Sequence, residues 1–425
     1  MKRFLILVAV LAFSTHVPSE LSAQAPSTGR NYKFANGNWF DGQRFVQRTF
    51  YSVAGILSSK RPPQVDRVFD FSGKYIVPPF GEAHNHNLDW SSDEQFARIN
   101  KMYLDAGIFY VKNPNSLLRT KKPTAAHINL PTTVDGVLSN GGLTGSGGHP
   151  IEIVTPRRGF KPEDGEGGFY YVIDTAADLE RKWPEIKAGQ PDFIKTYLLY
   201  SEEYAKRKND RQYDGWKGLH PAVLKEIVRR AHADGLRVST HVETATDFHN
   251  AAIAGVDEIN HLPGFRPDRN DFANYTNVSR YRISEADAKL VAKEHIVVVT
   301  TIGEAVDATF DEKYDERMRL AVRSMLIENL NVLRKHHVSI AIGSDSFRQT
   351  ALAEALSLTK LKSLDNLTLL KMWCEATAAT IFPKRKIGYL KDGYEANFLV
   401  LTGNPLADFA NVKTIGQRIK HGEPL

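Results

Sequence analysis

Two histidines stand two residues apart, at His84 and His86, within the stretch KYIVPPFGEAHNHNLDW from Lys74 to Trp90. The β-branched run Tyr75-Ile76-Val77 just upstream predicts a short strand that leads into them. Side chains two apart on an extended chain project from one face, so both imidazoles can reach one point. Imidazole is a common ligand of zinc and related cations, so the pair indicates part of a metal site. A chance pair of loop histidines is the alternative.

Four further side chains with metal or acid–base chemistry lie inside or at the ends of predicted strands. Lys195 lies within DFIKTY, His241 ends RVSTH, and His261 ends EINH. Asp345 follows SIAIGS. Each has an ordinary interpretation as a packing histidine, a snorkelling lysine or a helix-capping aspartate. Together with the histidine pair, the ordered set is better explained by one shared site.

The middle of the chain alternates predicted strands with amphipathic helices. Helices are predicted over 220–234, 284–294 and about 311–335. Strands are predicted over 107–111, 133–139, 193–198, 237–242, 258–262, 296–301 and 338–343, and the strand before His84 makes eight. This alternation predicts a parallel (β/α)8 TIM barrel, in which the carboxyl ends of all strands meet at one mouth. A doubly wound open sheet is the structural alternative.

Both ends of the chain have a different pattern. From Asn31 to Lys74, short apolar and polar runs alternate between turn signals such as Asn36-Gly37 and Asp41-Gly42, and this pattern returns from about Ile387 to Leu425. Short antiparallel strands are therefore expected at both ends. We predict a small β-sandwich domain built from 31–74 plus 387–425, and a barrel over 75–386.

The composition is that of an ordinary soluble globular protein, and 425 residues suit one barrel of roughly 250 residues or more with an accessory module. The net charge of +6 is spread thinly. Its densest cluster, Lys206-Arg207-Lys208, is followed by Asp210 and lacks interleaved aromatic residues. A solvated face is therefore expected there, and no nucleic-acid partner.

The first 25 residues match the pattern of a secretory signal peptide. Lys2-Arg3 precedes the apolar run from Phe4 to Phe13, and the small-residue region from Ser22 to Ala25 follows. About ten apolar residues are too few to span a bilayer, so no stable membrane span is expected after cleavage. A periplasmic or secreted location is predicted, with an uncleaved anchor as the alternative. The lone cysteine, Cys374, excludes an internal disulfide and is expected to be a buried structural thiol.

From about Asn31 to the carboxyl terminus, the sequence resembles the metal-dependent amidohydrolase superfamily, and within it the imidazolonepropionase and prolidase-like branch. The motifs that carry the resemblance are IVPPFGEAHNHN, DFIKTYL, GLRVSTHVET, GVDEINHLPG, AIGSDS and EATAATIFPKRKIGYLKDGYEANFLVLTGNPL. The helix VLKEIVRRAHADG and the loop GLTGSGGHP point to that branch. Two departures occur: Phe80-Gly81-Glu82-Ala83 stands where Gly-Leu-Ile-Asp is common, and Ala396-Asn397 where an Ala-Asp pair is usual. Neither departure removes a predicted ligand.

The resemblance implies a hydrolase that cleaves an amide C–N bond with two zinc ions. The implied ligands are His84, His86 and Asp345 for the first ion and His241 and His261 for the second. Lys195, carbamylated by carbon dioxide, would bridge the two ions, since a carbamate offers them two oxygens whereas an ammonium would repel them. A metal-bound hydroxide would attack the carbonyl, and Asp345 would pass its proton to the leaving group.

Three residues near the predicted mouth are candidates for holding a small-molecule substrate. His149 lies in the glycine-rich GSGGHP, Tyr200 just past Lys195, and Arg348 three residues after Asp345. An ordinary loop residue is an equally good interpretation of each. Seven other histidines are expected to be structural or solvated: His127, His220, His232, His249, His295, His336 and His337.

The leading prediction is therefore an exported zinc-type amidohydrolase that acts on a dipeptide or an N-acyl amino acid, either as a monomer or as a homo-oligomer. One alternative is a mononuclear relative that opens a cyclic amide or lactone with Lys195 unmodified. Another is a non-catalytic binding protein on the same barrel. A deaminase is a third, because Glu243 follows His241 by two residues, although superfamily deaminases place their glutamate differently.

Overall fold

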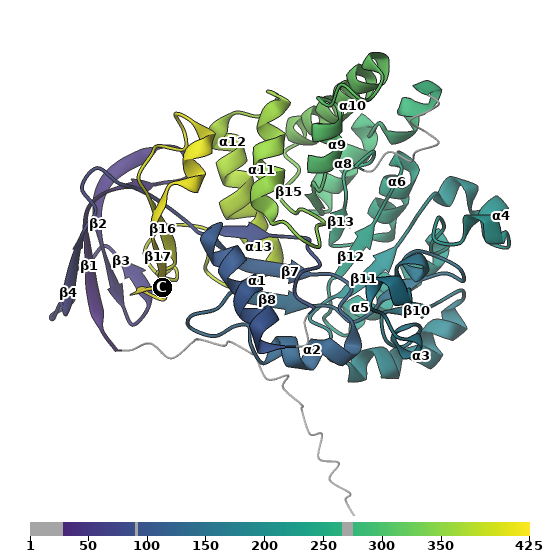
Figure 1. Ribbon diagram of the computed structural model, residues 1–425, viewed down its shortest axis with the longest axis horizontal. Coiled ribbons are helices and arrows are strands. Elements are labelled where there is room, and N and C mark those ends of the chain that lie inside the picture. Colours follow the sequence, from purple (N-terminus) through teal and green to yellow (C-terminus); the bar gives the residue numbers. More distant parts are fainter. Residues whose placement is uncertain (1–28, 90–91, 266–274) are drawn as a thin grey trace, which may run out of the picture.

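The computed structural model describes residues 29–89, 92–265 and 275–425, and the predicted signal peptide lies outside these residues (Figure 1). Figure 1 shows a helix-covered strand barrel beside a smaller sheet in which the first and last strands of the chain lie together. Among the described residues, no helix combines the length and the apolar character that a membrane span requires.

Parallel strands form the barrel in two hydrogen-bonded runs. The first run is β6 (Phe80–Glu82), β7 (Ile108–Asn113) and β8 (Asp135–Leu138). The second is β10 (Tyr170–Val172), β9 (Gly142–Thr144), β11 (Ile194–Tyr197), β12 (Val238–His241), β13 (Glu258–Asn260), β14 (Val297–Val299) and β15 (Ile340–Ala341). The strand predicted over 133–139 corresponds to β8, which pairs with β7, and β9 is a further strand just beyond it that pairs with β11.

Backbone hydrogen bonds close this sheet between its first and last strands. The Ala83 amide donates to the Ile342 carbonyl over 3.0 Å, just beyond the ends of β6 and β15. The amides of Ser344 and Asp345 both donate to the His84 carbonyl, over 3.1 and 2.8 Å. A doubly wound sheet would have two open edges, so this closure confirms the predicted TIM barrel.

Helices surround the barrel, and several of them begin at a residue whose side chain caps the first turn. Ser284 caps α8 by accepting from the Asp287 amide, and Asp315 caps α10 at a later start than predicted. The bounds are α1 (Asp93–Asp105), α2 (Leu118–Ala125), α3 (Ala176–Ala188), α4 (Tyr204–Arg207), α5 (Pro221–Ala233), α6 (Ala245–Ala254), α8 (Glu285–Lys293), α9 (Gly303–Ala308), α10 (Glu316–Lys335), α11 (Ala351–Lys360), α12 (Asn366–Lys371) and α13 (Thr377–Ile381). Cys374 is buried between α12 and α13, as expected of a structural thiol.

The smaller sheet combines strands from both ends of the chain. Its strands are β1 (Asn31–Phe40), β2 (Phe45–Val53), β3 (Ile56–Ser58), β4 (Arg67–Asp70), β5 (Tyr75–Val77), β16 (Phe398–Leu401), β17 (Ile415–Lys420) and β18 (Glu423–Pro424). They pair in the order β18-β17-β16-β5-β1-β2-β3, with β4 also on β1. Phe398 from the late segment packs edge-on against Phe34 and Trp39 from the early one, with ring centroids 4.8 and 5.0 Å apart.

One predicted strand belongs to a different sheet from the one expected. The run Tyr75–Val77 forms β5 of the smaller sheet, between β1 and β16, whereas the barrel strand before His84 is Phe80–Glu82. Pro78 and Pro79 separate the two strands. Since proline has no amide hydrogen for a ladder, the pair ends one strand and lets the chain begin another.

A buried charge cluster joins the late strand β17 to the barrel. The Lys420 ammonium, fully buried, lies 2.7 Å from an Asp135 carboxylate oxygen at the start of β8, and it also donates to the carbonyls of Leu130 and Thr133. Arg385 donates to the other Asp135 oxygen over 2.8 Å. Burial alone would raise the pKa of Asp135, but the attraction of Lys420 and Arg385 outweighs it and lowers that pKa.

Replacing Lys420 by methionine should lower the free energy of unfolding by about 3–5 kcal/mol, because it removes one of the two cations that neutralise the buried Asp135 and the donor to the carbonyls of Leu130 and Thr133. Urea unfolding at neutral pH measures the loss, and Lys60→Met, at an exposed lysine, should change little. Asp135 contributes stability that is present above its ordinary pKa of 3.8 and lost as pH falls through its lowered value. The difference between variant and wild type should therefore shrink in acid, and a difference below about 1 kcal/mol at neutral pH would contradict the prediction.

Candidate metal centre

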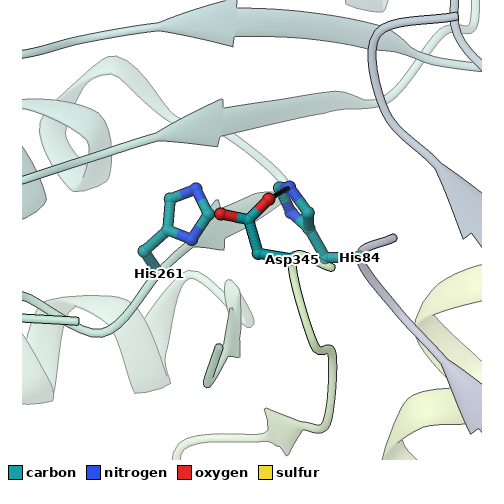
Figure 2. A group of neighbouring side chains, drawn as sticks. All are labelled: His84, His261 and Asp345. Carbon is teal, nitrogen blue, oxygen red and sulfur yellow. Dashed lines mark ion pairs between the residues drawn. The ribbon is translucent and has the colours of Figure 1, made fainter. Parts of the chain in front are cut away.

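The strand ends bring the predicted ligands to one mouth of the barrel. One Asp345 oxygen, Oδ1, lies 3.3 Å from His84 Nε2 and 3.0 Å from His86 Nε2. Figure 2 shows the Asp345 carboxylate between the rings of His84 and His261. One ligand atom from each of these three residues lies within 4.8 Å of the others. Side chains that are up to 261 residues apart in the sequence thus form one cluster.

His241 extends this cluster on the side of His261. The centroids of the His241 and His261 rings are 4.3 Å apart, and the His261 and His84 rings are 4.7 Å apart. The two predicted ligand sets, one with His84 and one with His261, are thus not separated in space, because the His261 ring lies beside both His84 and His241. Phe265 stacks on the His261 ring at 3.9 Å, and the exposed Phe347 stacks on His86 at 4.9 Å.

Lys195 is buried beneath the histidines. Its amine donates to Asn260 Oδ1 over 2.8 Å. Burial lowers the pKa of Lys195 to about 7, although attraction to Asp345 and Glu258 opposes the shift. Lys195 is also close enough to depress the pKa of His84, which burial first and Lys195 second lower to about 4. A large share of Lys195 is therefore the uncharged amine near neutral pH, and this is the form that reacts with carbon dioxide.

The protonation states around Asp345 suit a cation. Burial alone would raise the pKa of Asp345, but hydrogen bonds from His84 and His86 outweigh it and hold that pKa well below its ordinary value. Asp345 is therefore anionic and His84 neutral at pH 7, which are the forms that bind metal ions. The Asp345 side chain also keeps 24% of its surface exposed, so water or a substrate can reach it.

The donor set fits a divalent cation in both chemistry and geometry. Zinc binds imidazole nitrogen and carboxylate oxygen at roughly 2.0–2.2 Å, which separates neighbouring donors in a tetrahedron by about 3.3 Å. The nitrogens of His84 and His86 lie 3.3 and 3.0 Å from the Asp345 oxygen. The Asp345 oxygen therefore lies at coordination spacing from each of these two nitrogens, and the described residues whose ligand atoms all lie within 4.8 Å of one another are His84, His261 and Asp345.

Two backbone positions at this mouth carry strain. His261 and Asp345 adopt left-handed conformations, with φ of +78° and +50°, although neither is glycine. Such conformations cost on the order of 1–3 kcal/mol each and persist only where the surrounding structure holds them. His261 directly follows β13 and Asp345 lies four residues after β15, and in both places the turn aims a predicted ligand into the mouth.

A buried glutamate that the sequence gave no reason to select fixes the Asp345 loop. Glu82 accepts from the Ser344 amide over 2.9 Å, the Ser344 hydroxyl over 3.0 Å and the Ala351 amide over 2.6 Å. It thus ties β6 to the segment that carries Asp345, and burial raises its pKa to about 8. The only signal in the sequence was that Glu82 departs from the usual motif.

The sequence also gave no indication of a second polar network inside the barrel. The Lys112 ammonium on β7 lies 2.8 Å from a Glu258 oxygen on β13, and both are buried. Ser239 and Asn260 donate to the same Glu258 oxygen over 2.8 Å each. Asn260 in turn accepts from Lys195, so the network holds the Lys195 amine in place from below.

The three substrate candidates occupy different surroundings. His149 lies near the cluster, with its ring centroid 5.2 Å from that of His241, and its Nδ1 contacts Glu152. The buried Tyr200 ring lies between the guanidinium groups of Arg207 and Arg280, at 3.9 and 4.8 Å. Arg348 is exposed and is not brought to the cluster. It lines a cavity of about 540 Å³ with residues of α1, α11 and the late segment, among them Met102, Leu352 and Val412.

The seven histidines that were expected to be structural or solvated have surroundings of that kind. His220 caps α5 by accepting from the Ala222 amide. Four more lie 2.6–3.0 Å from, or contact, a carboxylate outside the cluster: His127, His232, His249 and His336. His295 and His337 follow α8 and α10 in left-handed turns.

Comparison with known proteins agrees with the fold and gives the family. The model of the amidohydrolase family matches residues 195–415, which is more than half of the chain. A crystal structure of an amidohydrolase has a TM-score of 0.69 at 19% identity and covers 93% of this chain and 98% of its own. A Xaa-Pro dipeptidase with bound methionine in its active site has a TM-score of 0.68 at 16% identity, and the match covers 93% of this chain and 99% of the dipeptidase. A. niger ochratoxinase has a TM-score of 0.69 at 17% identity, and the match covers 93% of this chain and 95% of the ochratoxinase.

The structural likenesses, all below 20% identity, establish the fold, whereas the sequence match to the family model establishes membership. No curated protein sequence matches the chain. The superfamily prediction is confirmed. The chain belongs to the amidohydrolase family and is a metal-dependent hydrolase that acts on carbon–nitrogen bonds.

Proposed function

We propose that this hydrolase cleaves the amide bond of a dipeptide or an N-acyl amino acid, with two zinc ions held at the mouth of the barrel. The observation that carries the proposal is the position of Asp345 Oδ1, at 3.0–3.3 Å from two histidine nitrogens and beside a third histidine. Similar structures include a Xaa-Pro dipeptidase and a prolidase complexed with N-methylphosphonate-L-proline, which supports this substrate class.

The ligands of the first ion would be His84, His86 and Asp345, and those of the second His241 and His261. A divalent cation in this position lowers the pKa of water and polarises a carbonyl oxygen. Asp345 is anionic, reaches the mouth with its exposed side, and would accept the proton of the attacking water. It would then deliver that proton to the amide nitrogen that leaves, as a general base followed by a general acid.

Lys195 would join the two ions once it is carbamylated. Its uncharged amine attacks carbon dioxide, a nitrogen–carbon bond forms, and one proton is released, which leaves an anionic carbamate. The pKa of about 7 makes this amine far more available than an ordinary lysine. The hydrogen bond from Lys195 to Asn260 supports the runner-up, a mononuclear enzyme that keeps the lysine unmodified and opens a cyclic amide or lactone.

His149 would contact the substrate, since its ring lies beside His241 and its Nδ1 is held by Glu152. The secretory pattern at the start of the chain supports action in a periplasm or in the medium.

Metal analysis tests the two-ion proposal. Wild type purified with zinc and bicarbonate should hold about two ions per chain, and Lys195→Ala about one. Lys121→Ala, which removes a buried lysine of α2 that binds Asn140, is the matched control and should keep both. One ion in both wild type and Lys195→Ala would end the two-ion proposal in favour of the mononuclear one. Turnover is then compared over dipeptides, N-acyl amino acids, cyclic amides and lactones, and hydrolysis of only the last two would contradict the substrate class.

A further inference from the structure

A buried carboxylate contacts His241 at the ring nitrogen Nε2. Glu243 Oε1 lies 3.1 Å from that nitrogen, and the two side chains keep only 1% and 4% of their surface exposed. An ionised carboxylate can only accept hydrogen bonds, so the proton of the His241 ring belongs on Nε2. Nδ1 is then the nitrogen of this ring that binds a cation.

His261 shows the same arrangement on the opposite nitrogen. Its Nδ1 lies 2.6 Å from the hydroxyl of Thr301, and that hydroxyl donates its own hydrogen to the Thr300 carbonyl over 2.8 Å. Thr301 therefore accepts from Nδ1–H, which makes Nε2 of His261 the metal-binding nitrogen. Both distal histidines thus have an orienting partner, and in each the partner selects the tautomer.

The backbone holds Glu243 firmly in this position. The amides of Glu243 and Thr244 donate to one Asp247 oxygen over 3.2 and 3.1 Å. The Gly264 amide, from the loop after β13, donates to the Glu243 carbonyl over 3.4 Å. Because Glu243 follows His241 by two residues on an extended segment, both project to the mouth, while Val242 between them packs in the hydrophobic core.

We propose that Glu243 is a positioning residue for the second cation. It holds the His241 ring in the tautomer that presents Nδ1, and as an anion it makes the ring a stronger donor to the metal. Carboxylate–histidine–metal chains of this kind typically contribute a factor of about 10–100 in metal affinity. The inference rests on the proposed metal centre, but the hydrogen bond that it invokes exists without a metal.

Stepwise titration with cobalt(II), followed by visible absorption, separates this role from a merely structural one. In Glu243→Ala, the second equivalent should bind about 10–100 times more weakly while the first binds as in wild type. The affinity of Glu243→Gln for the second equivalent should lie between those of wild type and Glu243→Ala, because the amide oxygen of glutamine still accepts from Nε2 of His241. Glu202→Gln, at a carboxylate of the neighbouring loop that contacts Thr244 and Arg280, is the matched control and should titrate as wild type.

Nitrogen-15 spectra of the histidine rings give a second measurement, and this one can be made on the metal-free protein. Wild type should show His241 protonated on Nε2, and Glu243→Ala should show a mixture of tautomers. Unchanged binding of both equivalents in Glu243→Ala, or equal weakening of both, would overturn the proposal. So would cobalt bands that shift as much in Glu243→Gln as in Glu243→Ala, because this would make Glu243 a direct ligand. Wild type that binds no cation would refute the proposed metal centre, and the tautomer measurement would still decide whether Glu243 orients His241.

Discussion

Removal of divalent cations should abolish amide hydrolysis by this chain, and zinc should restore it. The Asp345 oxygen lies 3.0–3.3 Å from nitrogens of His84 and His86, and the proposed nucleophile is water and not one of these side chains. Their role is therefore to hold the metal ion and to transfer protons, and the water molecule is not reactive enough without an ion that lowers its pKa. Dialysis against a chelator, followed by metal analysis and assay of the same sample, measures the loss.

The barrel should survive this treatment, because its core consists of apolar residues and its closure is made by backbone hydrogen bonds. Circular dichroism before and after chelation is the control. Added zinc should also raise the melting temperature, since a ligand that binds only the folded state stabilises it. Turnover that continues in protein without a divalent cation would refute the proposed function.

Replacing Asp345 by asparagine should lower kcat by a factor of about 10²–10⁴, the usual contribution of a positioned acid–base group. Asparagine keeps the size of the side chain but can neither accept the proton of the attacking water nor deliver it to the leaving nitrogen. Some loss of metal is expected too, because Asp345 supplies the only anionic oxygen of the closest three-residue group. The assay is therefore run at saturating zinc, with metal content measured in parallel.

Asp408→Asn is the matched control for this change. Asp408 is an exposed carboxylate that caps a short helical turn in the late segment, and its replacement should leave kcat unchanged. A kcat for Asp345→Asn within about tenfold of wild type, at full metal occupancy, would exclude Asp345 as the proton carrier.

Much of the site could be predicted because two simple geometric rules apply to it. Residues two apart on a strand share a face, which pairs His84 with His86, and the carboxyl ends of barrel strands share one mouth, which adds His241, His261 and Asp345. In the structure, His84 and His86 lie just beyond β6 and not on it, and Asp345 contacts both. Metal roles for the individual side chains stay predictions.

The parts that could not be predicted depend on contacts that no local pattern encodes. Tyr75–Val77 has the same strand propensity in either sheet, and only its partners β1 and β16 place it outside the barrel. Lys112 and Glu258 are 146 residues apart, so their buried pair follows from barrel registration and not from spacing. In the sequence, Glu82 was only a departure from a motif, whereas in the structure it accepts hydrogen bonds that fix the loop carrying Asp345.

The sheet made from both ends of the chain has a consequence for synthesis on the ribosome. Its inner strand β16 lies between β5 and β17, so the β5 edge of the early strands lacks a partner until a strand made more than 300 residues later. Contacts between such distant segments slow folding, because a long loop must be closed before they stabilise anything. Until translation ends, the aromatic face around Phe34 and Trp39 lacks Phe398 to cover it, which makes the nascent chain a natural client for chaperones.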